Sequence, residues 1–167
     1  MSEAFDRAVA IVLQQEDSTG TGVVTNDPAD PGGETRWGIS QRFLDQAGLP
    51  FRARDLFREQ AIAIYHEAFW NEYRFELLPE PIAVKLFSFL VNAGPDPAFR
   101  ILQRALRACL VEVEEDGVLG PLTRAAVGRA PSTDCLLAAL RSEMAGFYRD
   151  LDRPRFERGW LNRAYSA

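Results

Sequence analysis

Residues 5–16 read FDRAVAIVLQQE, and this stretch decides how the first part of the chain folds. Phe5, Val9, Val12 and Glu16 recur at intervals of four, three and four residues. Because an α-helix has about 3.6 residues per turn, these four side chains fall on one narrow stripe. The other side of the segment carries charged and amide side chains, as a solvent-facing side does. The pattern predicts an amphipathic helix whose apolar stripe packs into a core.

The carboxyl group of Glu16 closes this apolar stripe. At the end of a buried stripe it would lose water, which favours the protonated state from which a general acid donates. A glutamate at a helix end can instead turn its side chain into solvent. The sequence therefore suggests Glu16 as a proton donor and leaves the second arrangement open.

A turn-rich stretch follows, and residues 25–40 read TNDPADPGGETRWGIS. The Asp-Pro steps and the Gly-Gly pair predict tight turns and exclude a helix. Asp27 and Asp30 are either turn formers that bond to their own backbone, or polar groups that hold a water beside Glu16. Thr35 begins a short segment that can form a strand, and its hydroxyl can orient the same water. An acid with polar partners suits cleavage of a glycosidic bond.

Several motifs together resemble glycoside hydrolase family 108, the muramidases that cut peptidoglycan and occur in phage lysis and bacterial secretion systems. The resemblance covers nearly the whole chain, and the Asn-Asp-Pro…Asp-Pro-Gly-Gly-x-Thr run is its most specific part. Besides residues 5–16 and 26–40, the motifs are Ile64-Tyr65, Phe69-Trp70, Val91-Asn92-Ala93-Gly94 and Arg158-Gly159-Trp160-Leu161. In that family the glutamate that matches Glu16 is the catalytic acid.

The resemblance implies a mainly α, lysozyme-like helical globule with a small β-hairpin near residues 23–39. The implied reaction is hydrolysis of the β-1,4 bond between N-acetylmuramic acid and N-acetylglucosamine, with Glu16 protonating the leaving oxygen. Asp27 or Asp30, together with Thr35, would position water or stabilise positive charge on the sugar ring. Asp27 is preferred because it follows the asparagine of the family motif. The candidate substrate-binding residues are Asn26, Trp37, Trp70 and Asn92.

Two features of the chain depart from the family pattern. Residues 17–25, DSTGTGVVT, make the link after Glu16 about five residues longer than in relatives, and they lack the usual tyrosine. Loop-closure entropy grows slowly with length, so the insertion is tolerable but can change the shape of the cleft. Ser88 stands where relatives often carry an aspartate, which weakens any catalytic role for its helix.

The rest of the chain reads as further helices. One is expected from Asp55 to about Tyr73, and residues 81–93 form an apolar segment typical of a central buried helix. The later segment 116–123, DGVLGPLT, is similar to peptidoglycan-binding modules and can also be a plain connector between helices. We expect a catalytic muramidase region at residues 1–93 and a peptidoglycan-binding helical region at residues 94–167, packed as one body.

Composition narrows the classes of function. The net charge is −5, so the chain lacks the basic surplus of a nucleic-acid binder. No apolar run approaches the ~18 residues of a membrane span. The first residues, MSEAFD, do not read as a secretory signal. We therefore expect synthesis in the cytoplasm, and the resemblance implies that a holin or an export system releases the protein to the cell wall, in the periplasm or outside the cell.

The cysteine and histidine content predicts no metal site, and the muramidase resemblance implies no cofactor. The chain has one histidine and two cysteines, without Cys-x-x-Cys spacing. Cys109 and Cys135 both read as small buried hydrophobic residues rather than as a disulfide framework. His66 reads as a packed histidine.

Two other classes of function stay open. A non-catalytic peptidoglycan-binding module would carry Glu16 as a relic, and the altered loop after Glu16 is compatible with this. A helical partner-binding protein of a phage or secretion apparatus is the second alternative. Comparing peptidoglycan cleavage by the wild type and by Glu16→Gln separates the enzyme from the binding module. Pull-down by insoluble peptidoglycan, with no protein partner present, would argue against the second alternative.

Overall fold

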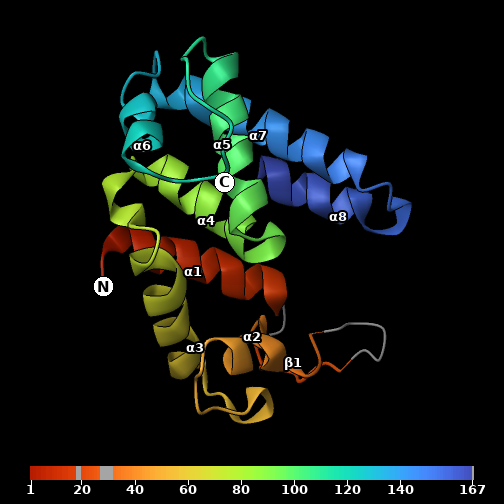
Figure 1. Ribbon diagram of the computed structural model, residues 1–167. Helices are drawn as coiled ribbons and strands as arrows, with labels where there is room; N and C mark the ends of the chain where they lie inside the picture. Colours follow the sequence, from red (N-terminus) through yellow and green to blue (C-terminus); the bar gives the residue numbers. More distant parts are fainter. Residues whose placement is uncertain (18–19, 27–31, 167) are drawn as a thin grey trace. The chain divides into compact units, whose positions relative to one another are not determined.

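The computed structural model describes residues 1–17, 20–26 and 32–166 (Figure 1). The chain divides into two compact units, Met1–Glu72 and Tyr73–Ala167. Helices dominate both units, and the described residues include a two-stranded antiparallel sheet in the first. The predicted mainly α, lysozyme-like fold with a small hairpin is confirmed.

The first helix, α1, spans Glu3–Glu16. Ser2 caps its start, because the Phe5 backbone N–H donates to the Ser2 Oγ at 3.3 Å. Such a cap stabilises a helix by about 1 kcal/mol. Phe5, Val9 and Val12 are each no more than 5% exposed. The predicted amphipathic helix is therefore confirmed, and Glu16 is its last residue.

The hairpin consists of β1 (Thr35–Arg36) and β2 (Ile39–Ser40). Thr35 pairs with Ser40, and Arg36 pairs with Ile39. Thr25 adds an isolated antiparallel bridge to Thr35. This arrangement brings the segment after Glu16 back onto the hairpin and confirms the small sheet expected near residues 23–39.

The rest of the first unit is built from short helical elements. They are α2 (Gln41–Gln46), the 3-10 helix η1 (Ala53–Asp55), α3 (Arg58–Tyr65) and the π-helix η2 (His66–Asn71). The prediction of one helix from Asp55 to Tyr73 is wrong in two respects. The helix begins at Arg58, and it changes from α-helix to π-helix at His66. Phe57 is the N-cap of α3, and its N–H donates to the Gln60 side-chain oxygen at 2.8 Å. This bond satisfies the N-cap amide, and the helix begins at Arg58.

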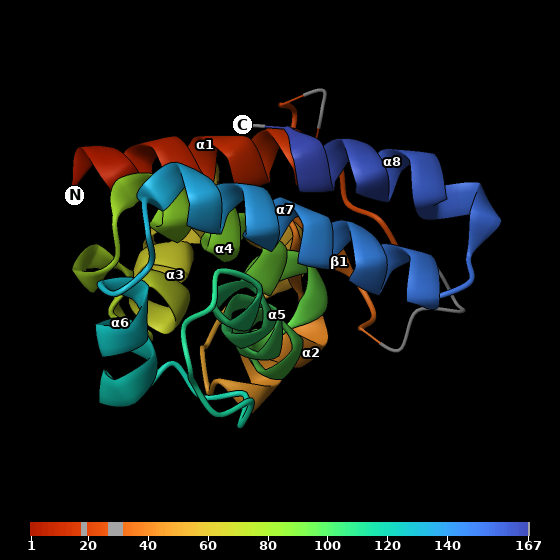
Figure 2. The ribbon, with the colours of Figure 1, turned by 90° about the horizontal axis from the view of Figure 1, so that it is seen from above.

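The second unit is entirely helical in its regular elements. They are the 3-10 helix η3 (Phe75–Leu77), α4 (Glu80–Ala93), α5 (Pro95–Ala108), α6 (Pro121–Val127), α7 (Thr133–Asp150) and α8 (Pro154–Tyr165). Helix α7 packs against α4, α5 and α8, and α7 and α8 lie side by side in both views (Figures 1 and 2). Nine consecutive residues of α4, Ile82–Leu90, are buried, which confirms the expected central helix.

Lys85 is a charged residue in the middle of this buried helix. It is 3% exposed, and its Nζ donates to the carbonyl oxygens of Arg163 at 2.6 Å and Ser166 at 2.7 Å. Burial, with Arg141 and Arg163 nearby, lowers the pKa of Lys85 to about 8. The lysine thus ties α4 to the C-terminal end of α8.

The two cysteines do not share one environment. Cys109 follows α5 and is buried, whereas Cys135 in the first turn of α7 is exposed. The prediction that both thiols are buried is therefore wrong for Cys135. Among the described residues, no helix is long and apolar enough to cross a membrane, and no group of three potential ligand side chains could hold a metal ion.

Candidate active site

Glu16 stands at the C-terminal end of α1, and its side chain is exposed. The prediction that this carboxyl is buried at the end of the apolar stripe is therefore wrong. The stripe itself is buried up to Val12, but the helix ends one turn later at Glu16. A carboxyl at this position is open to a ligand from solvent.

The turn of the hairpin lies directly against Glu16. Gly38 occupies this turn with φ +77°, and a Cβ added there would lie 2.7 Å from the Glu16 Cγ. The same Cβ would lie 2.6 Å from the hydroxyl oxygen of Tyr65. Only glycine combines this left-handed backbone with this space. The turn therefore braces the stem of the glutamate side chain.

Trp37, the residue before this glycine, is held by hydrogen bonds at its indole ring and at its backbone carbonyl. Its indole Nε1 donates to the Leu56 carbonyl at 3.1 Å, and its own carbonyl accepts from the Tyr65 hydroxyl at 3.0 Å. Its φ of +55° is uncommon for a bulky residue and persists only where the surroundings enforce it. The residue is 7% exposed. Trp37 thus positions the turn beside Glu16, while its predicted contact with substrate stays a prediction.

The longer link after Glu16 is anchored to the same hairpin. The Gly22 N–H donates to the Asp17 carboxylate, and the Gly22 carbonyl accepts from the Arg36 Nε at 2.7 Å. Gly22 has φ +67°, and a Cβ there would lie 2.4 Å from the Trp37 ring. The described part of the inserted loop is therefore packed onto the residues that support Glu16.

Thr35 and Asn26 lie at the start of the hairpin. The Thr35 amide and carbonyl pair with those of Thr25 at 2.8 and 2.9 Å, and its half-buried hydroxyl donates to the Gly33 carbonyl at 3.4 Å. Asn26 is exposed. Asp27 and Asp30, the predicted partners of the acid, lie outside the described residues.

An ion pair that sequence reasoning missed flanks the hairpin. Arg54 pairs with Glu34, and its hydrogen bond holds the pKa of that carboxyl below its ordinary value. The neighbouring Arg36 donates to the Arg54 carbonyl at 2.7 Å. Glu34 and Arg54 lie 20 residues apart in sequence, so their pairing had no local signal. Glu34 is held as a charged partner of Arg54.

The two remaining predicted substrate residues have structural contacts of their own. Trp70 is 2% exposed and packs edge-on against Phe5, with ring centroids 5.5 Å apart. A sugar could contact this ring only after a rearrangement, so its substrate role stays a prediction. Asn92 lies in the second unit, is exposed, and accepts a hydrogen bond from the Tyr148 hydroxyl at 2.9 Å. Ser88 is 4% exposed within α4.

The Asp116-Gly117 segment of the second unit is built into the fold by Gln103. This side chain is fully buried; it donates to Asp116 at 2.6 Å and to Thr123 at 3.1 Å, and accepts from the Gly117 N–H at 2.9 Å. The hydrogen bond from Gln103, followed by that from the Val118 amide, lowers the pKa of Asp116.

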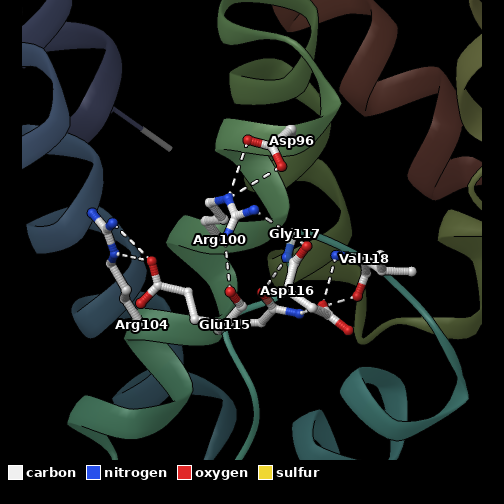
Figure 3. A network of polar contacts seen from close by, with 8 residues as sticks. Asp96, Arg100, Arg104, Glu115, Asp116, Gly117 and Val118 are labelled. Atoms are coloured by element: carbon white, nitrogen blue, oxygen red, sulfur yellow. Dashed lines mark hydrogen bonds and ion pairs between the residues drawn. The ribbon is translucent and has the colours of Figure 1, made fainter.

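Arginines of α5 hold the other side of the same segment (Figure 3). Arg100 contacts Asp96 at 3.1 Å and donates to the Glu115 carbonyl at 2.6 Å. Arg104 pairs with the Glu115 carboxylate at 2.7 Å. The Asp116-Gly117 segment therefore connects α5 to α6 and is fixed to α5 by these contacts.

The helical fold, together with two family matches, assigns the chain to a class, the glycoside hydrolases with a peptidoglycan-binding region. Residues 9–94 match the family described as Glycosyl hydrolase 108, and residues 97–165 match the one described as Predicted Peptidoglycan domain. The chain belongs to the glycosyl hydrolase 108 family. It is a peptidoglycan hydrolase of the muramidase type.

A solved structure gives the same picture of the fold. The structure of SagA from Brucella abortus is 28% identical in sequence, with a TM-score of 0.77. The match covers 96% of this chain and 88% of that chain. No curated protein matches the sequence.

Proposed function

We propose that Glu16 is the general acid that protonates the leaving oxygen of the β-1,4 bond between N-acetylmuramic acid and N-acetylglucosamine. The observation that carries this proposal is the contact between Glu16 and Gly38. The carboxyl is exposed, whereas its stem is braced by a turn that tolerates no side chain. A proton donor to a bound polymer must be accessible to the polymer and must be held in a defined position.

A bound glycan would supply the exclusion of water that the free protein does not. A saccharide lying over Glu16 would displace solvent from the carboxyl and strengthen its interaction with the glycosidic oxygen. Thr35, with Asp27 or Asp30, is proposed to orient the attacking water or to stabilise charge on the sugar ring. Thr35 lies two residues before the braced turn, in the strand that leads into it.

The substrate contacts are proposed from the residues around this turn. Asn26 is exposed at the start of the hairpin and offers an amide to the N-acetyl groups of the glycan. Trp37 would act mainly through its support of the turn. Asn92 and Trp70 are retained as proposed substrate contacts. The division into a catalytic region at residues 1–93 and a binding region at residues 94–167 is likewise proposed.

The test is cleavage of purified peptidoglycan by the wild type, by Glu16→Gln and by Glu3→Gln. Glu3 is an exposed carboxyl at the other end of the same helix, so its variant is a matched control. A general acid contributes about 100- to 10,000-fold to rate, and we expect Glu16→Gln to lose activity on that scale while Glu3→Gln keeps it. Mass spectrometry of the soluble products should find N-acetylmuramic acid at the reducing ends.

Equal turnover by wild type and Glu16→Gln would remove Glu16 from the mechanism. Products ending in N-acetylglucosamine would overturn the bond assignment. Binding of peptidoglycan without cleavage by the wild type would instead favour the non-catalytic module. Nuclear magnetic resonance of the first-formed product anomer separates retention from inversion.

We propose that the enzyme acts as a bacteriolytic endolysin after a holin or an export system releases it from the cytoplasm. Expression in a bacterial host with and without a co-expressed holin tests this. Lysis that requires both the holin and Glu16 would support the proposal. Lysis without any release factor, or no lysis with one, would overturn it.

A further inference from the structure

The sulfur atoms of Cys109 and Cys135 lie 3.4 Å apart. A disulfide bond length is about 2 Å, so closure requires the two sulfurs to approach by only about 1.4 Å. The two residues are 26 positions apart in sequence and are the only cysteines of the chain. Each thiol therefore has just one possible intramolecular partner.

Packed helices hold both thiols in place. Cys109 directly follows α5, and Cys135 is in the first turn of α7, where its N–H donates to the Ser132 hydroxyl at 3.1 Å. Helices α5 and α7 pack against each other within the second unit. The fold therefore places the two sulfur atoms within 3.4 Å of each other.

The pair differs in access to solvent. Cys135 is exposed, and Cys109 is 6% exposed behind it. Burial, followed by the contact with Cys135, raises the pKa of the Cys109 thiol to about 11. An external reagent therefore reaches Cys135 first, and Cys109 is placed to resolve the adduct from inside.

We propose that Cys109 and Cys135 are a dithiol site that closes into a reversible intramolecular disulfide on exposure to a disulfide oxidant. The expectation that this happens at the cell wall rests on the proposed release of the enzyme from the cytoplasm, where thiols are kept reduced. The chemistry of the pair does not depend on that release.

The reaction proceeds by two thiol–disulfide exchanges. The Cys135 thiolate attacks one sulfur of the oxidant, forms a mixed disulfide and expels the other sulfur as a thiolate. The Cys109 thiol loses its proton to solvent, attacks the Cys135 sulfur and expels the second thiolate. The protein loses two protons and two electrons; the oxidant gains the two electrons, and its two thiolates take up protons from solvent. Because Cys109 must ionise for the second step, closure should become faster as pH rises.

The bond would close a loop that contains the Asp116-Gly117 segment and α6. The same segment is already held on α5 by Gln103, Arg100 and Arg104. A covalent link between the end of α5 and the start of α7 would fix the ends of this loop. The disulfide is therefore expected to stabilise the proposed peptidoglycan-binding region rather than the residues around Glu16.

The experiment treats the purified full-length protein with oxidised glutathione and digests it with trypsin after blocking free thiols. We expect peptide 108–124 linked to peptide 130–141, and loss of two hydrogens from the intact mass. The oxidised protein should melt about 5–10 °C higher than the reduced protein, and dithiothreitol should reverse the shift. The variant Cys135→Ser should show neither the link nor the shift.

Three results would overturn the proposal. They are two freely alkylated thiols after oxidation, a stable glutathione adduct on Cys135 without the cross-link, and a covalent dimer on a non-reducing gel. Glu16→Gln should form the same cross-link as the wild type. A protein that forms the disulfide but does not cleave peptidoglycan would refute only the catalytic proposal. A protein that cleaves peptidoglycan but does not form the disulfide would refute only the dithiol proposal.

Discussion

Gly38 and Glu16 are in direct contact: a Cβ at position 38 would lie 2.7 Å from the Glu16 Cγ. The two residues come from different elements, the end of α1 and the turn between β1 and β2. The contact therefore depends on how the hairpin packs on the helix. It explains how an exposed carboxyl can still be held in one place.

Gly38→Ala should lower peptidoglycan cleavage at least 10-fold and destabilise the protein by about 2–3 kcal/mol. The change adds left-handed backbone strain at φ +77° and pushes against Glu16 and Tyr65. Gly48→Ala is the matched control, because Gly48 has φ +65° and nothing within 4 Å of its added Cβ. It should cost only about 1 kcal/mol and keep activity. Urea unfolding and turbidity assays measure both; identical effects of the two changes would refute the bracing role.

Tyr65→Phe should reduce the maximal rate more than substrate affinity. The Tyr65 hydroxyl donates to the Trp37 carbonyl at 3.0 Å, and its removal leaves that buried carbonyl without this donor. The expected cost in stability is about 1–3 kcal/mol, and the loosened turn should misplace Glu16. Tyr165→Phe, at a half-exposed ring, serves as control. Unchanged kcat in Tyr65→Phe would show that the turn needs no such support.

Lys85 should make stability rise with pH. Its pKa is lowered from 10.5 to about 8, so between these values the unfolded chain binds more protons than the native one. Under that condition the free energy of unfolding increases with pH, here by about 3 kcal/mol across the window. Lys85→Met lacks this contribution. The other titrating groups are common to both proteins, so their effect cancels in the difference between wild type and variant. Urea unfolding of both proteins at pH 7, 9 and 10.5 measures the free energy of unfolding at each pH. An equal dependence on pH in the two proteins would contradict the lowered pKa of Lys85.

Gln103→Leu should destabilise the second unit by about 2–4 kcal/mol. The change leaves Asp116, Thr123 and the Gly117 amide without the buried partner that organises them. Binding of insoluble peptidoglycan should weaken if this segment contributes to it. The control is Gln46→Leu at an exposed position of α2. Thermal melting and a pull-down assay report the two effects separately, and a wild-type melting temperature would refute the structural role of Gln103.

Local patterns were enough to predict the elements that carry the family motifs. The spacing of Phe5, Val9 and Val12 predicted α1, and the continuous apolar segment predicted the buried α4. The turn residues between them excluded a helix, and the family resemblance implied the hairpin that the structure shows. These signals are local because helix periodicity and turn chemistry depend on near neighbours in sequence.

Exposure of the candidate acid was not predictable in this way. Glu16 continues the stripe in sequence, but α1 ends at that residue and its burial depends on what packs beyond. The same limit applies to Cys135, which an apolar neighbourhood in sequence suggested to be buried. Neither the Glu34–Arg54 pair nor the Tyr65–Trp37 bond had any local signal, because each joins residues about 20 or more positions apart.

The amino-acid sequence by itself determined the class of fold, the family and the identity of the candidate acid, because these reside in periodicity and in short motifs. The tertiary structure alone decided that a glycine braces this acid, that its carboxyl faces solvent, and that the two thiols meet. Contacts of this kind arise only when separate elements pack together, and their free energy depends on the positions of atoms that sequence spacing does not specify.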